Sequence, residues 1–279
     1  MPRPQAPPIS ITRWTDGEWQ GVEDRVASEE PLQLLLDGEP LSVIMRTPGA
    51  DLELALGLLI AEGVIAGLDD VAEVRLSAES AESDPAIAAT GDIVESNQID
   101  VRLRSRARRR PQRSFLSSSA CGVCGATTIE SLALDLPVLP PGPAIDARAL
   151  PALAVQLRER QGLFEATGGL HAAGLFDPAG TLVHLREDIG RHNAVDKVVG
   201  RALLERRLPL WGWVLAVSGR AGYELVQKAV AAGITAMVAV GAPSSLAVAT
   251  AERFDLTLVG FLRERRFNVY AGRGRLTDR

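Results

Sequence analysis

Cys121 and Cys124 are the two cysteines of the chain, and they form a Cys-x-x-Cys pair inside the segment SSSACGVCG (117–125). Such a pair can close a disulfide, bind a metal, or act as a nucleophile with a resolving thiol. The surrounding serines and glycines predict a mobile, exposed loop, which makes two inert core cysteines the weaker interpretation. We therefore expect redox chemistry, sulfur chemistry or half of a metal site at this pair.

An arginine-rich stretch lies just upstream of the thiols. Its positive field would favour the thiolate, which is the reactive form, if the stretch folds near the cysteines. A solvated basic loop explains the same composition equally well. The arginines are Arg102, Arg104, Arg106, Arg108, Arg109, Arg110 and Arg113.

Zinc catalysis fits the sequence poorly. A zinc site usually needs four ligands, or three and a water, and the three histidines beside the thiols include no H-x3–5-H pair. His184 and Glu187 are spaced as H-x-x-E and follow the cysteines, unlike the nucleobase-deaminase pattern. No permanent metal is predicted.

Three polar segments each follow a strand predicted in the C-terminal half. Glycines there allow close approach of a ligand to the backbone, and helix starts with serine suit phosphate groups. Ordinary turn and capping chemistry explains any one segment alone, but three at one sheet edge predict a nucleotide-like pocket. The candidate residues are Ser218, Gly219, Arg220, Ser244, Phe261, Leu262, Arg263, Glu264, Arg265 and Arg266.

A further polar cluster, EDIGRHNAVDK (187–197), opens a predicted helix. His192 is its titratable member and a candidate ligand-binding residue. His171 follows a glycine pair, where a structural role is the more common one.

The composition limits the class of protein. The net charge of −5 argues against nucleic-acid binding, so any anion site must be a local positive cluster. The first ten residues lack the apolar region of a secretory signal, and no apolar run reaches the ~18 residues of a membrane span. We therefore expect a cytoplasmic protein that binds neither membrane nor nucleic acid.

Apolar strands alternating with helices in the second half predict an α/β domain with a largely parallel sheet. The proline-rich stretch 137–143 predicts a boundary between an N-terminal α+β domain (1–136) and a C-terminal domain (144–279). Trp14 and Trp19 are possible anchors for the N-terminal segment. The strands expected in the second half are 170–176, 181–186, 212–219, 234–241, 256–260 and 267–270, and the helices are 146–162, 191–207, 220–233 and 244–254.

As an ordered set, six segments resemble the formate dehydrogenase accessory sulfurtransferase (FdhD) family. The resemblance covers about residues 30–272. The segments are MRTPGADLELALG (45–57), SSSACGVCG (117–125), TGGLHAAGLF (167–176), EDIGRHNAVDK (187–197), SGRAGYELVQKA (218–229) and GFLRERRFNVYAG (260–272).

The resemblance implies a sulfur carrier that accepts persulfide sulfur from a cysteine desulfurase. It would pass the sulfur to the bis-molybdopterin guanine dinucleotide form of the molybdenum cofactor, bound as substrate, before that cofactor enters formate dehydrogenase. It also implies a homodimer and a three-layer C-terminal domain similar to cytidine deaminase, with a mostly parallel or mixed sheet. By motif, Cys121 carries the persulfide, Cys124 is its partner, and residues 261–266 bind the cofactor.

Two alternatives remain. A cytosolic thiol–disulfide oxidoreductase would use the same Cys-x-x-Cys pair, although such sites usually open a helix near the start of a βαβ domain. A chaperone that only holds the nucleotide cofactor would need neither cysteine.

Overall fold

The computed structural model describes residues 4–76, 97–105, 107, 116–117 and 136–278. Its largest sheet has six strands in the order β10-β9-β11-β12-β13-β14. The central strands β11, β12 and β13 run parallel, and β11 and β12 are continuous apolar runs, as expected for strands buried on both faces. The strands are β9 (His171–Phe176), β10 (Leu182–Asp188), β11 (Val214–Val217), β12 (Ala236–Ala239), β13 (Thr257–Arg263) and β14 (Arg266–Ala271).

The predicted largely parallel sheet is correct only for this centre. β9 pairs antiparallel with β10 and β11, and β14 pairs antiparallel with β13. The connections β9–β10 and β13–β14 are too short to hold a crossover helix, so these neighbours must run antiparallel. The sheet is therefore mixed.

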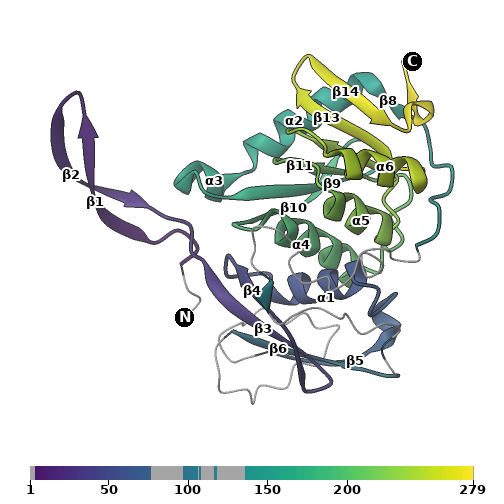
Figure 1. Cartoon of the computed structure of the whole chain (residues 1–279), viewed down its shortest axis with the longest axis horizontal. Coiled ribbons are helices and arrows are strands. Elements are labelled where there is room, and N and C mark those ends of the chain that lie inside the picture. Colours follow the sequence, from purple (N-terminus) through teal and green to yellow (C-terminus); the bar gives the residue numbers. More distant parts are fainter. Residues whose placement is uncertain (1–3, 77–96, 106, 108–115, 118–135, 279) are drawn as a thin grey trace.

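Helices cover both faces of the six-stranded sheet (Figure 1). Side chains alternate along β11: Val214 and Ala216 join the cluster of α2, whereas Leu215 and Val217 join that of α4, α5 and α6. The C-terminal half is thus a mixed α/β unit, and the specific likeness to cytidine deaminase stays a prediction. The helices are α2 (Leu150–Glu159), α3 (Gly162–Thr167), α4 (Arg191–Leu204), α5 (Tyr223–Ala231) and α6 (Ser245–Arg253).

A second sheet lies beyond the α4 layer, with α1 (Asp51–Ala61) between them (Figure 1). Its strand order is β5-β6-β3-β4-β7. Alternating leucines of β3 and most of α1 belong to the same apolar cluster as α4 and α5, so one core joins the two halves of the chain. The strands are β3 (Glu30–Leu36), β4 (Glu39–Arg46), β5 (Val71–Leu76), β6 (Gln98–Leu103) and β7 (Leu116–Ser117).

Two glycines set the separation of α1 and α4. A Cβ atom on Gly57 would lie 1.9 Å from the carbonyl oxygen of Asp196, and one on Gly200 would lie 1.8 Å from that of Glu53. The two backbones are therefore in direct contact.

The predicted boundary at 137–143 falls in a stretch without helix or strand, and the two-domain division stays a prediction.

A β-hairpin near the N-terminus projects from the body of the molecule (Figure 1). It comprises β1 (Pro8–Thr15) and β2 (Glu18–Arg25), joined by Asp16-Gly17 with both φ angles positive. Trp14 and Trp19 face each other across it and are 58% and 70% exposed. Their predicted role as anchors is wrong, since both side chains are exposed and neither belongs to an apolar core cluster.

The remaining elements are short. β8 (Ile145–Asp146) pairs in parallel with β15 (Leu276–Thr277), and described 3-10 turns span Leu68–Asp70, Ala147–Ala149 and Arg273–Arg275. In the part of the chain that the structure describes, no helix combines the length and the apolar character needed to cross a membrane.

Candidate functional site

The polar segments of the C-terminal half converge on one edge of the six-stranded sheet. The carboxyl ends of β11, β12 and β13 meet there because these strands are parallel. Antiparallel pairing brings the start of β9 and the end of β10 to the same edge, where His171 is opposite Asp188. Ser218 is bonded to Ala172, whose N–H donates to the serine Oγ at 2.9 Å. The predicted convergence is therefore present.

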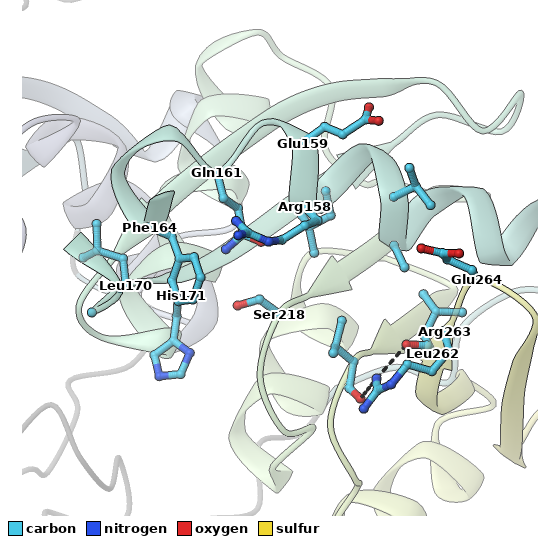
Figure 2. Close-up of a pocket in the computed structure, with 16 residues that line it drawn as sticks. Arg158, Glu159, Gln161, Phe164, Leu170, His171, Ser218, Leu262, Arg263 and Glu264 are labelled. Carbon is cyan, nitrogen blue, oxygen red and sulfur yellow. Dashed lines mark hydrogen bonds between the residues drawn. The ribbon is translucent and has the colours of Figure 1, made fainter. Parts of the chain in front are cut away.

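A cavity of about 790 Å³ opens at this edge. One wall comes from α2 and α3, through Arg158, Gln161 and Phe164, and the opposite wall comes from Leu262, Arg263 and Glu264 at the end of β13. Ser218 lies between the walls (Figure 2), and His171 also lines the cavity. The volume falls in the range of pockets that hold a nucleotide-sized ligand.

Four of the predicted cofactor-binding residues line this cavity: Ser218, Leu262, Arg263 and Glu264. The Arg263 Nη1 donates to the carbonyl oxygens of Val240 at 2.7 Å and Leu262 at 2.8 Å. These bonds fix the side chain at the carboxyl ends of β12 and β13. Its other guanidinium N–H groups make no hydrogen bond to a described residue, so they are available to an anion.

The other predicted cofactor-binding residues are not among those lining the cavity. The Ser244 Oγ accepts from the N–H of Ala247 at 3.2 Å and caps α6, which is ordinary capping chemistry. Gly219 lies beside the His171 imidazole, since a Cβ there would be 3.4 Å from Nδ1. Arg220, Phe261, Arg265 and Arg266 also lie outside the lining, and the binding role of all these residues stays a prediction.

His192 lies at the start of α4 and its Nε2 is 2.5 Å from Glu224 Oε2 at the start of α5. One turn further, Lys228 Nζ is 2.6 and 2.8 Å from the carboxylate oxygens of Asp196. Full burial raises the pKa of Asp196, and the Lys228 ammonium opposes this shift. The two contacts fasten α4 to α5, so His192 has a structural partner that the sequence did not reveal.

A buried network joins the end of β4 to the cavity edge. Asp188 Oδ2 is 2.7 Å from Lys197 Nζ and accepts from the N–H of Thr47 at 3.1 Å. Lys197 also donates to the carbonyl oxygen of Thr47 at 2.9 Å, and the N–H of Ile189 donates to Thr47 Oγ1 at 3.1 Å. Because Asp188 is opposite His171, this network holds the turn after β4 against the cavity edge.

The thiol pair itself, Cys121 and Cys124, lies outside the described residues, as do five of the seven arginines upstream of it. Of the other two, Arg102 Nε is 3.3 Å from Asp100 Oδ2. β7 is the last described element before the cysteines, and Ser117 is paired with Ile44 of β4. Among the described residues, no three His, Cys, Asp or Glu side chains are grouped so as to hold a metal ion.

His171 is expected to titrate below its usual pKa. Burial lowers the pKa of His171, the positive charge of Arg191 lowers it further, and Asp188 acts in the opposite sense. The neutral imidazole therefore predominates at pH 7. An NMR titration of the imidazole should show this shift, and Arg191→Gln should raise the pKa towards the usual value.

Arg13→Gln in the distant hairpin is the control and should leave the His171 pKa unchanged. Because the folded-state pKa is lowered, the stabilising contribution of neutral His171 is complete above the unfolded-state pKa. It is lost as the pH falls below that value. A His171 pKa at or above the usual value would contradict this assignment.

Sequence reasoning missed the wall formed by Arg158, Gln161 and Phe164. These residues lie where α2 ends and α3 begins, and their spacing resembles that of any amphipathic helix. The sequence favours a structural role for His171, whereas in the structure this residue lines the cavity. The glycine pair before His171 was the one local signal of a ligand-facing position.

Comparison with known proteins matches residues 27–277 to the FdhD/NarQ family. A protein of Nocardia farcinica named "Sulfur carrier protein FdhD" is 48% identical over 91% of this chain and 88% of its own length. A protein of the same name from Sulfolobus acidocaldarius is 41% identical over 94% and 95% of the two chains.

The fold is also similar to a crystal structure of a proposed formate dehydrogenase accessory protein from Desulfotalea psychrophila. The TM-score is 0.74 at 24% identity, and the match covers 98% of this chain and all of the other.

Proposed function

The chain belongs to the FdhD/NarQ family, and from this premise we propose that it carries sulfur on Cys121 as a persulfide. The sulfur comes from a cysteine desulfurase. It goes to the bis-molybdopterin guanine dinucleotide form of the molybdenum cofactor, held as substrate in the cavity, before that cofactor enters formate dehydrogenase. The carrier works in the cytoplasm as a homodimer.

Loading is a thiol–persulfide exchange. The Cys121 thiolate attacks the outer sulfur of the desulfurase persulfide, the S–S bond of the donor breaks, and the desulfurase thiolate leaves. One S–S bond forms as another breaks, so no oxidant or reductant is needed. The step requires a thiolate that the desulfurase can reach.

Delivery requires two electrons, because the outer sulfur must leave at the oxidation level of sulfide to become a metal ligand. Cys124 supplies them if its thiolate attacks the inner sulfur of the persulfide. A Cys121–Cys124 disulfide then forms and the outer sulfur departs with the electron pair of the broken S–S bond. A cellular dithiol reductant restores the two thiols. This assigns the resolving role, and not a relay, to Cys124.

The observation that carries the proposal is the position of β7. Ser117 is paired with Ile44 of β4, and the turn after β4 is hydrogen-bonded through Thr47 to Asp188 at the cavity edge. Cys121 follows Ser117 by four residues, and four residues span at most about 14 Å. Because β7 runs parallel to β4, the chain at Ser117 heads towards the end of β4, where the following turn contacts Asp188.

The chemistry of the cavity supports an anionic, nucleotide-bearing substrate. Arg263 offers guanidinium N–H groups, which bind phosphate oxygens well, and Ser218 offers a hydroxyl proton. Neutral His171 can accept or donate a hydrogen bond without repelling the arginine.

The test is complementation of a strain that lacks the protein. The Cys121→Ala/Cys124→Ala double variant should leave formate dehydrogenase inactive, while the folded variant still binds guanosine diphosphate. A cofactor-holding chaperone would instead retain activity without its cysteines. A thiol–disulfide oxidoreductase would reduce a disulfide substrate in turnover and gain no sulfur.

A further inference from the structure

Gln161 presents an unused amide to the cavity. The residue is only 5% exposed and lines the wall formed by α2 and α3 (Figure 2). Both backbone groups of Gln161 are hydrogen-bonded. Its N–H donates to the carbonyl oxygen of Arg158 at 3.3 Å, and its carbonyl oxygen accepts from the N–H of Glu165 at 2.9 Å. Its side-chain amide makes no hydrogen bond to any residue that the structure describes.

The fold explains why the amide is free. Gln161 occupies the N-cap of α3, where a side chain normally accepts from the first N–H groups of the helix. Here the carboxylate of Glu187, on β10, makes these capping hydrogen bonds instead. It accepts from the N–H of Leu163 at 2.9 Å and from the N–H of Phe164 at 2.7 Å. A residue of another element therefore caps α3, and the Gln161 amide is left for the cavity.

The groups beside this amide are flat. The Arg158 guanidinium lies 4.9 Å from the centroid of the Phe164 ring, and both residues line the same wall. Aromatic rings and guanidinium planes are the surfaces on which heterocyclic bases stack. A buried amide next to such a surface can pair with the edge of the stacked ring.

We propose that Gln161 determines specificity in this cavity by pairing with the edge of a 2-amino-4-oxopyrimidine ring. The amide oxygen accepts from the ring N–H, and the amide nitrogen donates to the exocyclic oxygen. Guanine and pterin share this edge. The inference rests on the proposed function, because the substrate proposed there contains both ring systems.

The test compares Gln161→Met with Gln156→Met by calorimetric titration with guanosine diphosphate and with neopterin. Gln156 is the matched control, since it lies on α2 outside the cavity lining. Its side-chain amide donates to the carbonyl oxygen of Gly180 at 3.3 Å. Loss of a two-bond pair should weaken binding about tenfold in Gln161→Met only. Loss confined to guanosine diphosphate identifies guanine as the ring, and loss confined to neopterin identifies the pterin.

Pyrophosphate, which has no ring, should bind Gln161→Met and the unmodified protein equally. The midpoint of thermal unfolding should not fall, because the amide lost from the free protein has no partner to lose. Unchanged affinity for both ring ligands would overturn the proposal. So would equal weakening of pyrophosphate, or a lowered midpoint that marks a structural role.

Persulfide loading separates this inference from the proposed function. Gln161→Met should acquire sulfur on Cys121 as the unmodified protein does, because the amide takes no part in thiol exchange. If the unmodified protein loads sulfur but binds neither ring ligand, the Gln161 proposal fails and the carrier role stands. If neither sulfur nor ring ligand is bound, both fail.

Discussion

Cys121→Ala is expected to abolish persulfide loading while guanosine diphosphate binding stays unchanged. The substitution removes the nucleophile that attacks the outer sulfur of the donor, and no described cavity residue is altered. Incubation with a cysteine desulfurase and cysteine, followed by mass spectrometry, measures the outcome. The unmodified protein should gain about 32 Da, the mass of one sulfur atom on a thiol, and the variant should gain nothing.

Cys124→Ala is the matched control, because it alters the second thiol and leaves the first. It should gain the same mass and then retain it when the molybdenum cofactor is added, since the thiol that releases the sulfur as sulfide is missing. An undiminished adduct on Cys121→Ala would move the acceptor role to Cys124. If the Cys124→Ala variant released its sulfur adduct at the normal rate without an added thiol, that result would contradict the resolving role of Cys124.

Gly57→Ala and Gly200→Ala are each expected to destabilise the protein by about 3 kcal/mol, the upper end of the usual cost of overpacking. A methyl group on either residue would lie within 2 Å of a backbone oxygen of the facing helix, so α1 and α4 would have to separate. Helix propensity alone would predict that both substitutions stabilise the protein, because alanine is more favourable than glycine by about 1 kcal/mol at an exposed helix position. Chemical denaturation measures the difference.

Gly67→Ala is the control for both variants. Gly67 has an extended φ of −173°, and a Cβ there would meet no atom within 4 Å. Its free energy of unfolding should change little. Stabilisation of the Gly57 or Gly200 variants would mean that the two helices are further apart than described.

The elements of the C-terminal half could be predicted because each carries a local signal. The runs VLAV and AMVA are buried on both faces, and each is followed by a helix that packs back on the sheet. The hairpin of β1 and β2 was missed even though Asp16-Gly17 is a strong turn signal. Its tryptophans suggested burial, and their exposure follows from the hairpin having no third strand or helix to cover it.

The site was predictable where the sheet alone determines it. Ser218 and Arg263 lie together because parallel strands end at one edge. The partner of His192 is Glu224 on another helix, which the position of His192 in the sequence does not specify. The cap that Ser244 makes is local, and it matches the ordinary capping chemistry that the sequence already offered as the alternative. Gln161 was missed because its amide is free only through Glu187, a residue on another element.

The central claim is that sulfur moves from Cys121 to a substrate held in the strand-end cavity. The most direct measurement adds the molybdenum cofactor to persulfide-loaded protein and follows the mass of the Cys121 adduct, with and without excess guanosine diphosphate. The account predicts that the cofactor discharges the adduct and that guanosine diphosphate prevents this by occupying the cavity. Discharge at the same rate in both samples, or an adduct that persists in both, would contradict it.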